Sequence, residues 1–184
     1  MANQDEFEAA IHFKHDMILY AQNNWPGIAG KLNAMFKLNP KLSDDNRASF
    51  AFFLAVLFVQ SRAPYNIFSK EQGERIWKYL KNTFSAEPQF GSYANESLDL
   101  YSSVWNQYIE KGLNPLFGVA SALLCNLSYE EKDTDMLLGM TLSDCIALSP
   151  TWWKNFSEKN KLVKSDIPLD IDGFIRFAAE INKR

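Results

Sequence analysis

The chain has 184 residues, a formal net charge of −3 at pH 7 and an aromatic content of 14%. This length predicts one domain with a sizeable apolar core. Lysine and arginine are spread along the chain without forming a basic stripe, which argues against nucleic-acid binding, because such proteins concentrate positive charge on one surface.

The first predicted helix covers residues 6–23. The residues before it lack the basic and apolar segments of a secretory signal, so we expect a cytoplasmic protein. Directly after it stands Trp25-Pro26-Gly27, and a proline inside a helical pattern usually ends the helix. We therefore expect a break at Pro26 and a separate short helix over residues 28–37.

The only two histidines, His12 and His15, fall with Asp16 on the polar arc of this helix. Imidazole and carboxylate groups are suitable metal ligands, so this arc is a candidate for half of a metal site. His15-Asp16 resembles the paired ligands of HD-type phosphohydrolases, which would imply a metal-dependent hydrolase. The resemblance covers these two residues only, because the separate upstream histidine of that family is absent. A solvated polar face explains the same pattern, and we expect no metal there.

Residues 48–59 read ASFAFFLAVLFV, and Ser49 is the one polar residue among them. The stretch is longer than a typical strand and shorter than the about 20 apolar residues that a membrane span needs. A helix that is apolar on all sides is buried when it does not cross a membrane. We therefore expect a buried helix over residues 47–62, with the other helices packed around it.

Local start and stop signals define the helices that follow. Ser69 and Gln72 form a capping box for a helix to residue 84, on whose outer face we expect a Glu71–Arg75 ion pair. Residues 85–94 are expected to be irregular.

The next boundaries are equally local. Asn95 is expected to cap a helix that Gly112 ends. Asn114-Pro115 combines a cap with a proline at the first helical position and predicts another helix. In that helix Gly118 and Ala122 predict close packing against a neighbour.

Two aromatic groups are candidate binding residues. Tyr101, Trp105 and Tyr108 line one helix face and could form a ligand pocket, although aromatic residues at this spacing are typical of a core. Trp152 and Trp153 are adjacent on a short helix expected after Ser149-Pro150. Neighbouring positions diverge by about 100°, so one indole is a candidate anchor for a protein partner.

The last third of the chain is expected to hold three helices, which begin near residues 128, 150 and 170. The first of these carries seven apolar residues: Met136, Leu137, Leu138, Met140, Leu142, Cys145 and Ile146. Cys125 and Cys145 lack the spacing of metal ligands and are expected to be buried, reduced thiols. A disulfide between them would need an oxidising compartment.

The fold class that these elements predict is all-α. We expect a single globular domain over residues 1–184, in which about eight helices surround the buried helix 47–62. No nucleophile elbow, phosphate-binding loop or dinucleotide-binding motif is present, and no carboxylate pair has catalytic spacing.

The leading hypothesis is a cytoplasmic, non-enzymatic, helical protein-interaction module, such as an adaptor, an inhibitor or an immunity-type protein. It would bind a protein partner and would need no cofactor, nucleic acid or membrane. Two alternatives stay open. The first is a small HD-like hydrolase that uses His12, His15 and Asp16. The second is a small-molecule-binding protein whose pocket is lined by Tyr101, Trp105 and Tyr108.

Overall fold

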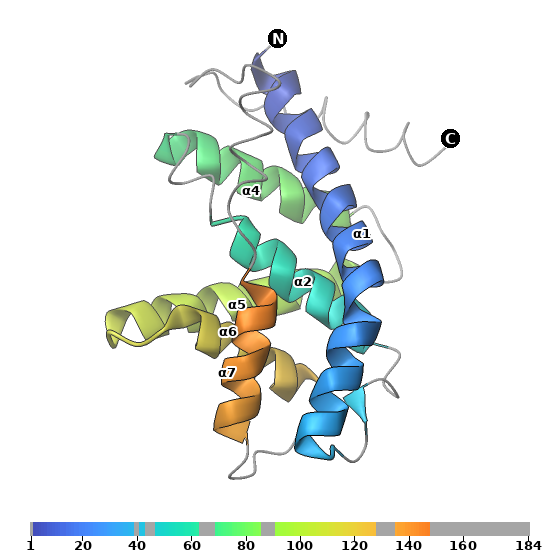
Figure 1. The fold of residues 1–184 in the computed structure, drawn as a ribbon. Helices are drawn as coiled ribbons and strands as arrows, with labels where there is room; N and C mark the ends of the chain where they lie inside the picture. The colour runs from blue at the N-terminus through green and yellow to red at the C-terminus, as the bar shows by residue number, and fades with distance from the viewer. Residues whose placement is uncertain are drawn as a thin grey trace. The chain divides into compact units, whose positions relative to one another are not determined.

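A computed structural model describes residues 2–38, 41–42, 47–62, 69–85, 91–127 and 135–147 (Figure 1). Over these residues the chain forms six α-helices and no strand, so the predicted all-α class is confirmed. The helices are α1 (Ala2–Phe36), α2 (Ala48–Gln60), α4 (Lys70–Ser85), α5 (Gly91–Glu110), α6 (Pro115–Asn126) and α7 (Asp135–Ile146). The helices expected near residues 150 and 170 lie outside the described residues.

Contacts along the chain define two compact units. Unit 1 combines the start of α1, up to Asp16, with α4 and with the start of α5, up to Asn95. Unit 2 combines the rest of α1 with α2, α6, α7 and the remainder of α5. That residues 1–184 form a single domain stays a prediction.

The expected break at Pro26 is wrong, because α1 is one helix with this proline inside it. A proline in a helix interior removes a backbone hydrogen bond and costs about 3 kcal/mol. Pro26 is exposed, so water can solvate the carbonyl that lacks a partner, while the nearby Trp25, Ala29 and Leu32 are buried. The Trp25 ring packs on Phe52 with centroids 5.0 Å apart. Burial of this continuous stripe offsets the cost of the proline.

The end of α1 carries a strained residue. Lys37 directly follows the helix and has a φ of 51°, in the left-handed region. This conformation commonly closes a helix, but glycine usually adopts it because a Cβ is unfavourable there. We expect Lys37→Gly to raise the free energy of unfolding by about 0.5–1 kcal/mol in urea titrations. Lys37→Ala keeps the Cβ and should bring no gain, so an equal gain from both variants would contradict this explanation.

In unit 1, α4 begins at the predicted capping box. The Gln72 N–H donates to Ser69 Oγ at 3.2 Å, so this prediction is confirmed. Glu71 lies in the first turn, where its own backbone N–H and the Ser69 hydroxyl hold the pKa of its carboxyl below the usual value. These contacts satisfy N–H groups that have no partner within the helix.

A buried ion pair joins α1 to α4 within unit 1. Arg75 Nε and Nη2 donate to the two carboxylate oxygens of Glu6 at 3.0 and 2.9 Å. The Arg75 and Glu6 side chains are 11% and 1% exposed. Next to them the Phe7 ring packs edge-on against Tyr79, with centroids 5.6 Å apart. Arg75 was expected to pair with Glu71 on the surface, but its bidentate partner is Glu6.

The start of α5 lies earlier than predicted. The helix begins at Gly91, not after Asn95, so the expected irregular stretch 85–94 is helical from residue 91 onward. A Cβ at Gly91 would lie 2.5 Å from the Phe84 carbonyl oxygen, so glycine permits α5 to begin this close to the end of α4. Asn95 does not cap the helix; its Nδ2 donates to Ser85 Oγ at 3.3 Å.

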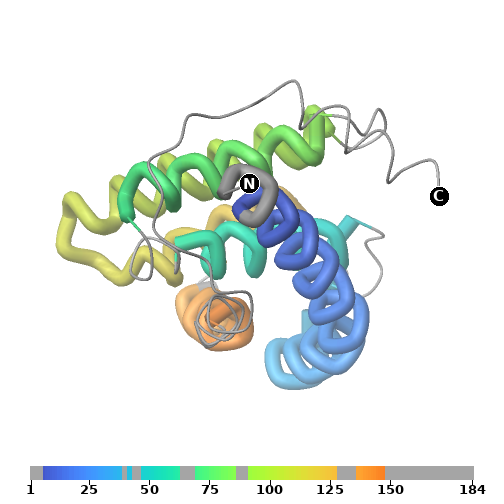
Figure 2. Tube along the Cα trace, turned by 90° about the horizontal axis from the view of Figure 1, so that it is seen from above, coloured from blue at the N-terminus to red at the C-terminus, as the bar shows by residue number. Residues whose placement is uncertain are grey.

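In unit 2, α5 and α6 form a helical hairpin, in which the two helices run side by side in both views (Figures 1 and 2). Gly112 has a φ of 66°, and the N–H groups of Gly112 and Leu113 donate to carbonyls in the last turn of α5 at 3.0 and 2.8 Å. Asn114 Oδ1 accepts from the Leu116 N–H at 3.0 Å, and Pro115 opens α6. Both predicted signals are confirmed.

The apolar helix α2 lies in unit 2, and ten of its 13 residues are buried. It contacts α6 and α7, and the Phe58 ring packs against Tyr101 and Trp105 of α5 with centroids 6.1 and 5.8 Å apart. None of the described helices combines the length and the apolarity that a membrane crossing requires.

Glycines bring α5, α6 and α7 into close contact. A Cβ at Gly118 of α6 would lie 2.8 Å from side-chain atoms of both Tyr108 and Val104 of α5. A Cβ at Gly139 of α7 would lie 2.7 Å from the Phe117 ring of α6. The close packing predicted at Gly118 is therefore confirmed, and Gly139 provides a second contact of the same kind.

Candidate interaction surface

The candidate metal ligands lie on the exposed side of α1. His12, His15 and Asp16 are all exposed, and His15 Nδ1 is 3.6 Å from Asp16 Oδ1. Across the residues that the structure describes, no group of three or more histidine, cysteine, aspartate or glutamate side chains is placed to hold a metal ion. A metal site here would need further ligands from elsewhere.

The aromatic row on α5 is packed against other aromatic rings. Tyr101 is fully buried, and it shares the Phe58 ring with Trp105. Tyr108 faces Phe117 of α6 with centroids 6.4 Å apart. Each of the three candidate pocket residues thus has a protein ring as its neighbour, and helix packing explains their spacing without a ligand.

The third candidate from the sequence, Trp152 and Trp153, lies outside the described residues. Its role as a partner anchor therefore stays a prediction.

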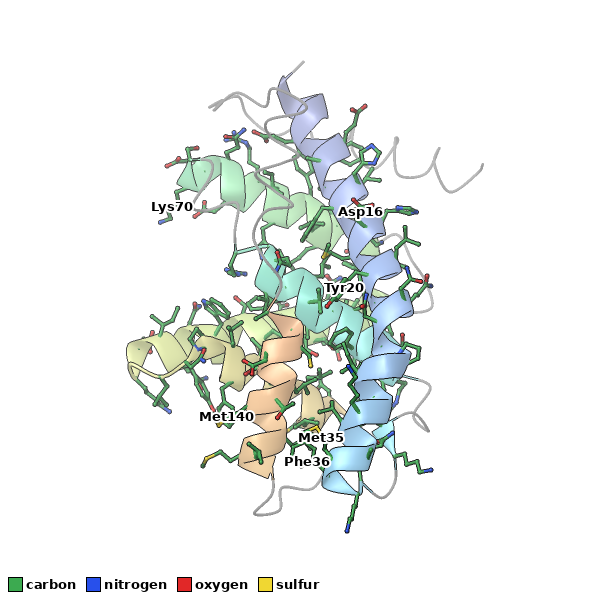
Figure 3. All side chains as sticks on the ribbon, in the orientation of Figure 1. Asp16, Tyr20, Met35, Phe36, Lys70 and Met140 are labelled. Carbon is green, nitrogen blue, oxygen red and sulfur yellow. The ribbon has the colours of Figure 1, made fainter. Side chains whose placement is uncertain are left out.

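The structure reveals a surface that the sequence did not single out. Met136, Leu137 and Met140 of α7 are 68%, 60% and 53% exposed. These positions span an arc of about 100°, and the fully buried Leu142 and Ile146 lie on the other side of the helix. We call Met136, Leu137 and Met140 the α7 apolar face; Met140 is labelled in Figure 3. A helix this apolar has more large side chains than its packed side can cover, so part of its apolar surface is exposed.

Packing on the opposite side fixes the position of this face. Gly139 lies directly against the half-buried Phe117 ring, and α7 contacts α2 as well as α6. Along the helix, Thr141 Oγ1 donates to the Leu137 carbonyl at 2.8 Å, and Ser143 Oγ donates to the Met140 carbonyl at 2.7 Å. The apolar face is therefore carried by a helix that is anchored on its buried side.

The charged residues in the sequence of α7 are acidic. The sequence of α7 contains Asp135 and Asp144 but no lysine or arginine. Asp144 is exposed and follows Leu137 by seven residues, which places it on the same side of the helix two turns further on. The face is thus apolar, and the sequence of its helix adds only negative charge.

The cysteines are less buried than expected. Cys125 is exposed and Cys145 half-buried, and both are free thiols. The apolar sequence neighbours of Cys125 face other sides of α6, so they do not cover it. Burial raises the pKa of the Cys145 thiol, Asp144 raises it further and Lys31 opposes both. The Cys145 thiol therefore stays protonated at neutral pH, which makes it a poor nucleophile. Burial also raises the pKa of Tyr20.

Comparison with known proteins gives no match: no protein-family model matches the chain, and no curated protein or solved structure is significantly similar to it. Function is therefore inferred from the geometry of the described residues.

Proposed function

We propose that the protein is a helical protein-interaction module that binds its partner through the α7 apolar face. The observation that carries this proposal is the exposure of Met136, Leu137 and Met140, each more than half exposed on one side of one helix. Soluble proteins that act alone seldom expose clustered large apolar side chains, and such clusters commonly mark interaction sites. Methionine is well suited to this role because its flexible, polarisable side chain adapts to the shape of a partner.

The chemistry of the face favours one kind of partner. An apolar strip along a helix fits the apolar stripe of a second amphipathic helix, read at positions i, i+3 and i+4. Asp135 and Asp144 lie toward the two ends of α7, and the helix has no basic residue. We therefore propose a partner helix whose apolar stripe is bordered by lysine or arginine, because charges of opposite sign would favour this register and suppress acidic competitors.

We further propose that the protein is a cytoplasmic adaptor, inhibitor or immunity-type protein that has no cofactor. We also propose that the chain forms a single domain of about eight helices around the helix 47–62. The near-complete burial of α2 supports the central place of that helix, and the modest negative charge supports a protein rather than a nucleic-acid partner. Trp152 and Trp153 follow α7 closely in sequence and are proposed as a second anchor.

Two synthetic peptides test the proposal. Both carry the same leucine stripe on a helical sequence; one is bordered by lysine and the other by glutamate. In fluorescence anisotropy, the full chain should bind the lysine-bordered peptide at least about tenfold more tightly. Leu137→Ser should weaken that binding by at least about tenfold, because truncation of an interface anchor removes about 2 kcal/mol or more.

Met35→Ser is the matched control, since Met35 is 63% exposed on α1 and lies outside the face. It should bind like the unchanged chain, and both variants should keep the same melting temperature. Failure of the unchanged chain to bind either peptide would overturn the proposal, as would an equal loss in the two variants. Affinity purification from the native host, with the unchanged chain and Leu137→Ser in parallel, would then identify the natural partner as the protein that the variant loses.

A further inference from the structure

The methionines of the chain differ sharply in exposure. Met136 and Met140 of α7 and Met35 of α1 are more than half exposed, whereas Met17 is only 5% exposed. Oxidation of a thioether requires that the oxidant reach the sulfur atom. The exposed methionines are therefore accessible to a small oxidant, and Met17 is protected.

Met136 and Met140 differ from Met35 in their position on the molecule. They are four residues apart on α7, so they lie next to each other on the helix surface, on either side of Leu137 in sequence. Together they supply two of the three side chains of the α7 apolar face. A change in the polarity of these two side chains would change the character of the whole face, whereas the same change at Met35 would not.

We propose that Met136 and Met140 form a reversible oxidation site at which hydrogen peroxide converts the α7 apolar face into a polar one. In each event the thioether sulfur attacks one peroxide oxygen, the S–O bond forms as the O–O bond breaks, and proton transfer releases water. The sulfur loses two electrons and becomes a sulfoxide, and the peroxide is reduced. Thiol-dependent methionine sulfoxide reductases reverse the change, one enzyme for each sulfoxide epimer.

The fold should survive this change. The packed side of α7 consists of other residues, among them Leu138, Leu142 and Ile146, which are buried and carry no sulfur. The contact between Gly139 and Phe117 likewise involves no methionine. Oxidation would therefore alter the exposed side of α7 and leave its anchoring intact. The site itself rests on exposure and position alone, whereas its effect on partner binding rests on the proposed function.

The first experiment exposes the full chain to graded hydrogen peroxide and measures the gain of oxygen at each methionine by peptide mass spectrometry. Met136 and Met140 should react at least about tenfold faster than Met17, because their sulfur atoms are accessible. Met35 should also react, which makes it an internal standard for an exposed methionine outside the face. Reaction of Met136 and Met140 at the slow rate of Met17 would overturn the proposal.

The second experiment measures the polarity of the face by retention on a hydrophobic-interaction column. The oxidised chain should elute earlier, and treatment with both types of reductase and a thiol should restore its retention. After peroxide, the retention of the double variant Met136→Leu, Met140→Leu should shift clearly less than that of the unchanged chain, because oxidation at Met35 remains, while Met35→Leu should shift almost as much as the unchanged chain. A shift that persists in the double variant and disappears in Met35→Leu would overturn the proposal.

Binding of the lysine-bordered peptide distinguishes a failure of the oxidation site from a failure of the proposed function. Oxidation should weaken that binding in the unchanged chain and leave it unaffected in the double leucine variant. If retention shifts as expected but the peptide binds neither form, the oxidation site stands and the proposed function fails.

Discussion

Replacement of Phe58 by alanine should lower the free energy of unfolding by about 3–5 kcal/mol, the usual loss for a buried aromatic side chain. Phe58 is fully buried near the end of α2, and its ring packs against Tyr101 and Trp105 of α5. Alanine would remove both ring contacts and leave a cavity. Because the cavity would be bordered by large rings held on a different helix, it could collapse only partly.

Phe50→Ala is the matched control in urea unfolding. Phe50 is on the same helix and is only half-buried, so its truncation should cost clearly less than that of Phe58. A loss below about 1 kcal/mol for Phe58→Ala would show that α2 does not contribute a core element, because truncation of a buried aromatic normally exceeds that value.

Arg75→Met is expected to produce a loss of similar size in unit 1, about 3–5 kcal/mol. The substitution leaves the Glu6 carboxylate, which is 1% exposed, without the two hydrogen bonds from the guanidinium group. An uncompensated buried charge is far more costly than a surface charge, because it loses its hydration as well as its partner. Urea unfolding of the full chain measures the effect.

A second substitution in the same chain tests the cause. Adding Glu6→Leu to Arg75→Met removes the stranded carboxylate and should recover most of the lost stability. Lys70→Met is the surface control, since the Lys70–Glu74 pair is exposed with an N–O distance of 4.0 Å; its removal should change stability by about 0.5 kcal/mol or less. Losses that simply add in the double variant would show that the ion pair is not the origin of the effect.

The helix boundaries that could be predicted from the sequence are those that local chemistry determines. The capping box at Ser69, the end of α5 at Gly112 and the start of α6 at Asn114 each depend on hydrogen bonds within a few residues. Two other boundaries, which were predicted incorrectly, depend on distant contacts. Helix α1 continues through Pro26 because Trp25 packs on α2, and α5 begins at Gly91 because the end of α4 lies against it.

The same distinction applies to the candidate site. Periodicity correctly placed His12, His15 and Asp16 on the solvent side of α1, because that helix has a clear polar arc. On α7 apolar residues occur all around the helix axis, so periodicity could not indicate that Met136 and Met140 face solvent. Only the contacts of α7 with its neighbours decide which apolar side is covered.

The ion pair between Glu6 and Arg75 also has a consequence for biosynthesis. The two residues are separated by 69 positions. At a ribosomal rate of about 5–20 residues per second, Arg75 is synthesised roughly 3–14 s after Glu6. During that interval the carboxylate stays hydrated and the start of α1 has no α4 to pack against. The nascent chain cannot complete unit 1 until α4 has emerged, so Glu6 reaches its native surroundings only after α4 has been made.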